Sequence, residues 1–214
     1  MPQAKSVDVL FLSHRHDIVS GAEKSLLELI EYLVSIKKTV HVIIGDNGDI
    51  TQHLDNLGVS YSIVHNPFWA RGGEDPTEFN FTQPWNPSND TVLAITNLIR
   101  SLNPKICVTN TIVTPWLAYS SAITSTPHVW MVHELHTKGL NLRYAIDKSQ
   151  VLKSIDILSD AIFYSSEYTA SEYTPHMRFN PQAQVIFPAG VNPTLTTTSP
   201  SPFKTGGIKI ISVS

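Results

Sequence analysis

His133 and Glu134 are the residues whose types and position point most directly to chemistry. His133 ends the apolar run Pro127–His133, which we predict to be a buried strand, and Glu134 follows at once. An imidazole titrates near neutral pH and can donate to or accept from a hydroxyl, and a neighbouring carboxylate can orient the ring or hold a hydroxyl. We therefore predict that His133 and Glu134 are catalytic. The alternative is a buried histidine bonded to the backbone, with Glu134 in solvent.

A second group of polar side chains lies in the loop after the first predicted strand, where His14 and His16 flank Arg15. Together with His133 and His136 they suggest a metal site above the sheet. A His-x-His pair in a loop is not a closed zinc spacing, however, and no cysteine ligands accompany it. We predict no metal site, and we expect His14 and His16 to bind substrate as polar groups.

The same loop leads into a predicted amphipathic helix. Val9–Leu12 is a continuous apolar run typical of a buried strand, and from Gly21 onward apolar residues recur at helical spacing. Ser20 is the expected N-cap, and Glu23 completes a capping-box pattern. A turn of this kind presents unpaired backbone N–H groups, a favoured place for a phosphate or another anion. Ser20, Gly21 and Ala22 are therefore predicted binding residues, unless this is an ordinary α/β unit with an undecorated loop.

The rest of the chain alternates strand-like apolar runs with helical patterns. We expect strands at 39–45, 59–65, 105–109, 127–133, 161–164 and 184–187, and helices at 49–57, 90–102, 116–123, 140–158 and from 167 onward. Gly58 is expected to stop the helix at 49–57. This order predicts an α/β fold, a Rossmann-like parallel sheet flanked by helices. Asn110 falls at the carboxyl end of the fourth strand, where ligands gather in such sheets, and is a further predicted binding residue. Asn110 and Thr111 are expected to form a turn before the next helix.

Composition excludes several other classes of protein. Of 214 residues, 42% are hydrophobic and 15% charged, which indicates a globular chain, and a net charge of −3 without a basic stripe argues against nucleic-acid binding. Cys107, the single cysteine, cannot form an internal disulfide and is expected to be a small core residue in a reducing compartment. No signal peptide and no apolar run of roughly 18 residues is visible, so we expect a cytoplasmic protein, able to work at the inner face of the membrane.

Three short motifs, in this order, carry a family resemblance: SGAEK at 20–24, VHE at 132–134 and PAGV at 188–191. With the order of the predicted elements, they resemble the N-terminal domain of GT-B glycosyltransferases of the GT4-like group. The resemblance implies an acceptor-side Rossmann-like domain over 1–194, a linker over 195–207 that is rich in Thr, Ser, Pro and Gly, and a first strand of a C-terminal domain at 208–214.

The resemblance also implies an activity. A retaining hexosyltransferase of this kind moves a sugar from a nucleotide-sugar to a sugar, lipid-linked or protein acceptor. His133 would contact the transferred sugar, and the backbone N–H groups of Gly21 and Ala22 would lie near the donor diphosphate. The absent C-terminal domain would bind the nucleotide, so we expect this chain to be inactive alone and able to self-associate. The donor is a substrate; no cofactor is expected, since the loop lacks the G-x-G-x-x-G fingerprint.

Two alternatives to this activity stay open, and one segment has no assigned role. The first alternative is a GT-B-type sugar-nucleotide epimerase, and the second is a non-catalytic module that binds a glycan or a protein. The segment 66–89 is rich in proline and aromatic residues. It is either an acceptor-binding flap or an irregular excursion that packs its aromatic side chains on its own domain.

Overall fold

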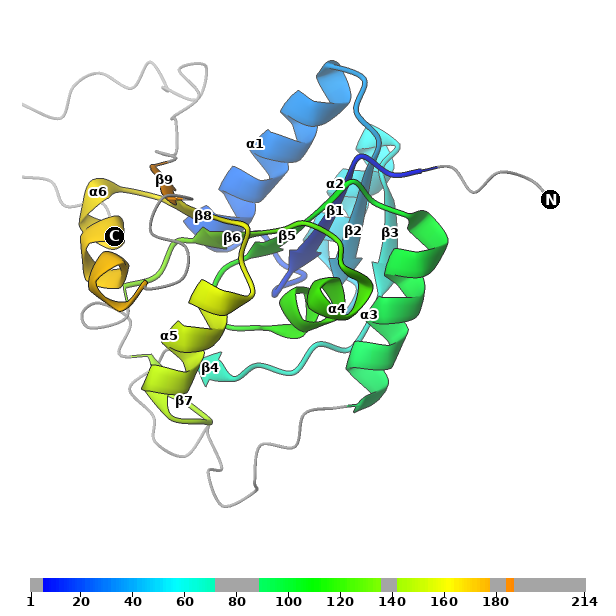
Figure 1. Cartoon of the computed structure of the whole chain (residues 1–214). Coiled ribbons are helices and arrows are strands. Elements are labelled where there is room, and N and C mark those ends of the chain that lie inside the picture. The colour runs from blue at the N-terminus through cyan, green and yellow to red at the C-terminus, as the bar shows by residue number, and fades with distance from the viewer. Residues whose placement is uncertain (1–5, 72–88, 136–141, 178–183, 187–214) are drawn as a thin grey trace, which may run out of the picture.

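The computed structural model describes residues 6–71, 89–135, 142–177 and 184–186 (Figure 1). Within these residues, seven strands form one sheet in the order β3-β2-β1-β5-β6-β8-β9, and every neighbouring pair is parallel. Their bounds are β1 Val9–Ser13, β2 Val40–Ile44, β3 Ser60–Ile63, β5 Ile106–Asn110, β6 His128–Val132, β8 Ala161–Tyr164 and β9 Gln184–Ile186.

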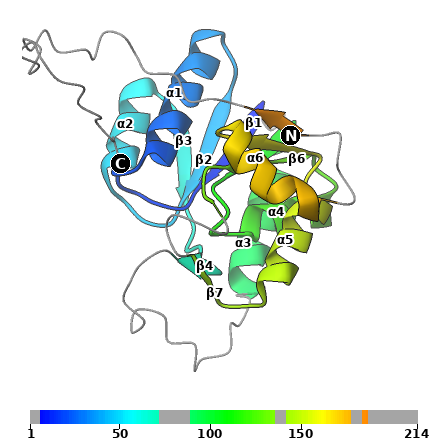
Figure 2. The same cartoon turned by 90° about the vertical axis from the view of Figure 1, so that its left-hand side faces the viewer.

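Helices cover both faces of this sheet (Figures 1 and 2). The chain runs outward from β1 to β3, then returns to β5 beside β1 and runs outward in the opposite direction. Because crossovers between parallel strands are right-handed, the two directions place helices on opposite faces. Helices α1 (Gly21–Ser35) and α2 (Asp49–Leu57) lie on one face, and α3 (Asn89–Leu102), α4 (Trp116–Thr124) and α5 (Lys148–Ile157) on the other, with α6 (Glu167–Tyr173) beside β8 and β9. The predicted fold class is confirmed.

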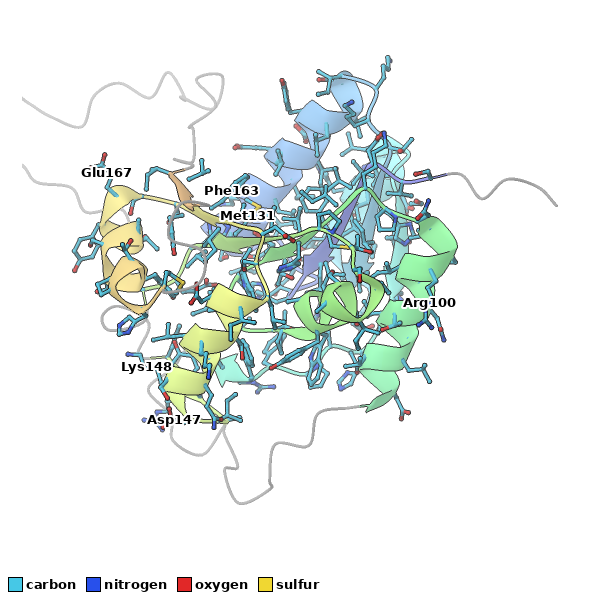
Figure 3. All side chains as sticks on the ribbon, in the orientation of Figure 1. Arg100, Met131, Asp147, Lys148, Phe163 and Glu167 are labelled. Carbon is cyan, nitrogen blue, oxygen red and sulfur yellow. The ribbon has the colours of Figure 1, made fainter. Side chains whose placement is uncertain are left out.

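Alternating side chains of the buried strands supply a separate core to each face. In β1, Phe11 points to the α1 side, whereas Leu10 and Leu12 point to the α3 and α4 side, and all three are at most 1% exposed. Met131 and Phe163 join the core under α1 (Figure 3). A strand buried on both faces needs apolar residues at successive positions, which is why these strands appear as continuous apolar runs in the sequence.

Local capping signals in the sequence are confirmed where the structure describes them. Ser20 is the N-cap of α1, and its capping box with Glu23 is present. Gly58 ends α2 in the left-handed conformation, with φ of 66°. Cys107 is fully buried, and burial raises the pKa of its thiol to about 11, as expected for an unreactive core residue.

The helix predicted over 140–158 is wrong at its start, because α5 begins only at Lys148. The Asp147 carboxylate accepts a hydrogen bond from the Ser149 N–H at 2.7 Å and so forms the N-cap. Before this cap, β7 (Arg143–Tyr144) pairs antiparallel with β4 (Ala70–Arg71). The apolar residues of this segment pack onto the same core as a helix would, which explains the misleading pattern.

The described start of the 66–89 segment packs on its own domain. Trp69 is fully buried and stacks on Trp130 with ring centroids 6.0 Å apart, and its indole N–H donates to the Ile112 carbonyl. This supports the packed excursion for residues 66–71 only. Residues 72–88, the predicted domain boundary at 194, the linker at 195–207 and the strand at 208–214 lie outside the described residues. In the described part of the chain, no helix is both long and apolar enough to cross a membrane.

Replacing Trp69 with alanine tests this anchor. The change leaves a large cavity beside Trp130 and should lower the free energy of unfolding by about 3 to 5 kcal/mol, measured by urea denaturation. The control is Tyr168→Ala, because Tyr168 is 54% exposed. This substitution should lower the free energy of unfolding by less than about 0.5 kcal/mol. Equal effects of the two substitutions would show that the segment is not anchored as described.

Candidate functional site

The carboxyl ends of β1, β5 and β6 meet at the centre of the sheet, where the direction of strand order reverses. Ser13 pairs in register with Asn110, and Asn110 with Met131, so the loops after the three strands start side by side. In open α/β sheets this reversal point is the usual place for a ligand. The predicted residues of β1, α1, β5 and β6 come together at this edge.

Asn110 links the start of α1 to the predicted catalytic histidine. Its side chain is fully buried; Nδ2 donates to the Ala22 carbonyl at 3.2 Å, and Oδ1 lies 2.9 Å from His133 Nε2. Because Nδ2 faces a carbonyl, Oδ1 must be the acceptor, and His133 Nε2 must carry the proton. Burial also lowers the pKa of His133, against an opposing effect of Glu23. The ring is therefore neutral at neutral pH. Among the described residues no hydrogen bond uses its Nδ1, which can accept one from a ligand.

His14 lies beside this group. Burial, followed by the charge of Arg15 and the electrostatic effect of the nearby His133, lowers the pKa of His14 to about 4, so its ring is also neutral. Its Nδ1 lies 3.3 Å from Glu23 Oε1, a distance at which the two atoms could pair, but their alignment is not that of a hydrogen bond. Phe68 covers the ring at a centroid distance of 5.8 Å. His14 therefore contributes a neutral imidazole to the same edge as His133.

The capping box already uses part of the helix start that was predicted to bind an anion. The Ser20 N–H and hydroxyl both donate to Glu23 Oε2, at 3.1 and 2.5 Å, and Ser20 Oγ accepts from the Ala22 N–H at 3.2 Å. Gly21 differs, because it is exposed and a Cβ there would meet open space. Gly21 thus offers the accessible backbone at this helix start, whereas Ser20 and Ala22 are held inside the cap.

His16 lies on the other side of the loop. Its carbonyl accepts from the Ile50 N–H at 3.0 Å, and a Cβ at Gly48 would come within 2.4 Å of that carbonyl oxygen. Its exposed side chain makes no hydrogen bond to Asn110 or His133 within the residues that the structure describes. The structure therefore brings His14, but not His16, to the central group.

Glu134 is buried rather than in solvent, with 8% of its surface exposed. Its Oε2 accepts from the backbone N–H groups of Ile112, at 3.2 Å, and of His133, at 3.3 Å. Burial raises its pKa to about 7, although these N–H groups act in the opposite direction. Asn110, rather than Glu134, is the group that orients the His133 ring. Glu134 instead ties the turn after β5 to the turn after β6.

Thr111 makes the turn after β5 and was not singled out from the sequence. Its φ is 82°, unusual for a β-branched residue. The Thr111 N–H donates to the Met131 carbonyl at 2.9 Å, and its carbonyl accepts from the Trp130 indole at 2.7 Å. This conformation lets Asn110 reach His133 while the next N–H reaches Glu134. Apart from a turn expected at this point, the sequence holds no signal for it.

Within the ranges that the structure describes, no three His, Cys, Asp or Glu side chains are placed to hold a metal ion. A cavity of about 310 Å³ lies at the opposite, amino-terminal edge of the sheet, between the ends of α4 and α5. Its His128 is bonded on both ring nitrogens, to the Leu158 carbonyl at 2.9 Å and to Thr109 Oγ1 at 2.8 Å. Both nitrogens of the His128 imidazole are therefore already used within the fold.

Comparison with known structures agrees with this fold. Over 91% of its length, the chain is similar to Anabaena HepE, solved in complex with UDP-glucose, with a TM-score of 0.62 and 16% identity, and it covers 47% of that chain. It is similar to a glycosyltransferase from Rickettsia africae, with a TM-score of 0.58 and 14% identity over 87% of this chain and 44% of that one.

A further structure, described as a candidate UDP-N-acetylglucosamine 2-epimerase from Listeria monocytogenes, has a TM-score of 0.53 and 11% identity, over 84% of this chain and 44% of that one. The chain thus spans slightly less than half of each of the three structures.

Sequence comparison gives the family. No curated protein matches the chain. The sequence model of Glycosyltransferase Family 4 matches residues 19–195, most of the chain, which include Asn110, His133 and Glu134. The chain therefore belongs to glycosyltransferase family 4 and has the fold of the N-terminal domain of a GT-B enzyme.

Proposed function

We propose that this chain is the acceptor-side domain of a retaining glycosyltransferase of the hexosyltransferase type. A second domain would bind the nucleotide, and the sugar would pass from a nucleotide-sugar to an acceptor held by this domain. Family membership supports the transferase role. The chain covers 47% of HepE, which supports a second domain in the complete enzyme. HepE was solved with UDP-glucose and with UDP, so uridine diphosphate sugars are the first donors to test.

The observation that carries this proposal is the bond between Asn110 and His133 at the reversal point of the sheet. This bond fixes the proton on His133 Nε2, and burial keeps the ring neutral, so that Nδ1 would be an acceptor for a sugar hydroxyl. Gly21, at the positive end of the α1 dipole, would lie near the diphosphate. Closure of the two domains would exclude water and align the reacting groups. An acceptor carried by a lipid would place the enzyme at the inner face of the membrane.

Glu134 is the second group in this proposal. A carboxyl group with a pKa of about 7 can hold or release a proton at neutral pH, which suits a group that handles a hydroxyl. The backbone N–H groups of Ile112 and His133, which donate to Oε2, would hold the carboxyl group in place while the proton moves.

Epimerisation of a sugar nucleotide is a second candidate, because the similarity to the Listeria structure extends over 84% of this chain. The two activities differ in their products. An epimerase releases an altered sugar nucleotide without any acceptor, whereas a transferase releases the nucleotide and requires one. A non-catalytic module would bind a glycan or a protein and give neither product.

Replacing His133 with alanine tests the proposed site. In the complete enzyme, meaning this chain with the proposed second domain, His133→Ala should lower transfer from UDP-glucose, UDP-galactose or UDP-N-acetylglucosamine by about 100-fold. The readout is UDP release and sugar incorporation, with acceptor binding retained. The matched control is His53→Ala on α2, because His53 pairs with Glu31 away from the site. Equal activities in the two variants would exclude His133 from the reaction.

A second prediction concerns the 214-residue chain by itself. It should release UDP from these donors no faster than buffer does, because it would lack the nucleotide-binding half and the closed active site. Turnover by the purified chain would refute the two-domain proposal.

The pH dependence of stability tests the environment of Glu134. Its folded pKa of about 7 lies above the usual value of 4.5, so the folded state binds more protons than the unfolded state between these values. The contribution of Glu134 therefore falls as pH rises from about 4.5 to about 7, by at most about 3 kcal/mol.

The low pKa of His14 has the opposite effect over a similar range, so the wild-type curve alone is not diagnostic. Glu134→Gln keeps an oxygen for both N–H groups and removes the charge. The stability of this variant relative to wild type should increase with pH, as measured by urea denaturation. A difference that stays constant from pH 4.5 to pH 7 would contradict the raised pKa.

A further inference from the structure

Two buried polar atoms beside the start of α1 have no hydrogen-bond partner among the residues that the structure describes. They are Glu23 Oε1 and His14 Nδ1, which lie 3.3 Å apart. The Glu23 side chain is completely buried, and its other oxygen, Oε2, is bonded to Ser20. The His14 side chain keeps 12% of its surface exposed, so its ring reaches the surface although its Nδ1 is buried. The helix cap accounts for one carboxylate oxygen and leaves the second without a role.

The chemistry of the two atoms defines what would complete them. Burying a polar group without a partner costs more than the bond itself gains, so such groups are rare in native structures. A carboxylate oxygen only accepts hydrogen bonds, and a neutral imidazole nitrogen can donate one. A single hydroxyl satisfies both, because its hydrogen points to Glu23 and its oxygen accepts from His14. The diphosphate of a nucleotide-sugar has no hydrogen to give at neutral pH, and the carboxylate repels it.

The pair also belongs to the same site as His133. The charge of Glu23 raises the pKa of His133, and His133 in turn lowers the pKa of His14. His133 itself is joined through Asn110 to Ala22, the residue before Glu23. A ligand that bonds to His133 Nδ1 therefore brings its neighbouring groups toward Glu23 and His14.

We propose that Glu23 and His14 together bind one hydroxyl of a sugar at this edge of the sheet, so that Glu23 determines substrate specificity in addition to capping α1. The proposal rests on the proposed function, because it requires a sugar substrate. That hydroxyl belongs either to the transferred sugar or to the acceptor, and the chemistry of recognition is the same in both cases.

The test is Glu23→Gln in the complete enzyme. Glutamine also serves at this position of a capping box, so helix α1 and the thermal unfolding midpoint should be largely preserved. The substitution removes the negative charge and can turn an N–H donor toward the ligand. We therefore expect kcat/KM to fall about 10- to 100-fold. Glu28→Gln is the matched control, because it makes the same chemical change on the exposed side of the same helix. It should leave kcat/KM within about twofold.

Deoxy analogues identify the hydroxyl and its source. One arm uses monodeoxy forms of the UDP-sugar that the wild-type enzyme uses best, and the other uses methyl glucoside and its monodeoxy forms as acceptors. Removal of the recognised hydroxyl should lower kcat/KM of the wild-type enzyme about as much as Glu23→Gln does. The same removal should lower kcat/KM of the Glu23→Gln variant only slightly further. His14→Gln should likewise make kcat/KM insensitive to the removal of that hydroxyl.

Each outcome decides the matter. Non-additive losses at one hydroxyl position support the proposal, and the arm in which they occur names the donor or the acceptor. Active enzyme in which Glu23→Gln matches Glu28→Gln, or in which the losses simply add at every position, overturns this inference while the proposed function stands. Absence of sugar transfer in the wild-type enzyme overturns both.

Discussion

The two hydrogen bonds of the Asn110 side-chain amide are the interaction on which the site depends. One fixes the start of α1 through the Ala22 carbonyl, and the other fixes the proton on His133 Nε2. Because the amide is fully buried, neither bond can be exchanged for water without cost. A single side chain thus sets the distance between the start of α1 and the His133 ring.

Packing on both faces of the sheet makes this arrangement possible. The central strands are apolar over most of their length, and Asn110, His133 and Glu134 lie where β5 and β6 end. The left-handed turn at Thr111 then lets Asn110 bond to His133 while the Ile112 N–H bonds to Glu134. Trp130 holds the Thr111 carbonyl, and Trp69 stacks on Trp130, so the aromatic core beneath the turn supports its unusual conformation.

The parts of the fold that depend on neighbouring residues could be predicted from the sequence. The capping box of Ser20 with Glu23, the stop at Gly58 and the buried strands all follow from local spacing and residue type. The start of α5 was missed because apolar residues before Asp147 pack equally well in a short strand.

The contacts within the site needed the tertiary structure. His133 and Asn110 were each found at strand ends, but their bond depends on the register between β5 and β6, which the sequence does not encode locally. For the same reason, Glu23 was recognised only as a cap. The most direct measurement is the nitrogen NMR spectrum of the His133 imidazole at neutral pH. We expect a neutral ring with a protonated Nε2 and a bare Nδ1; a charged ring or a protonated Nδ1 would contradict this account.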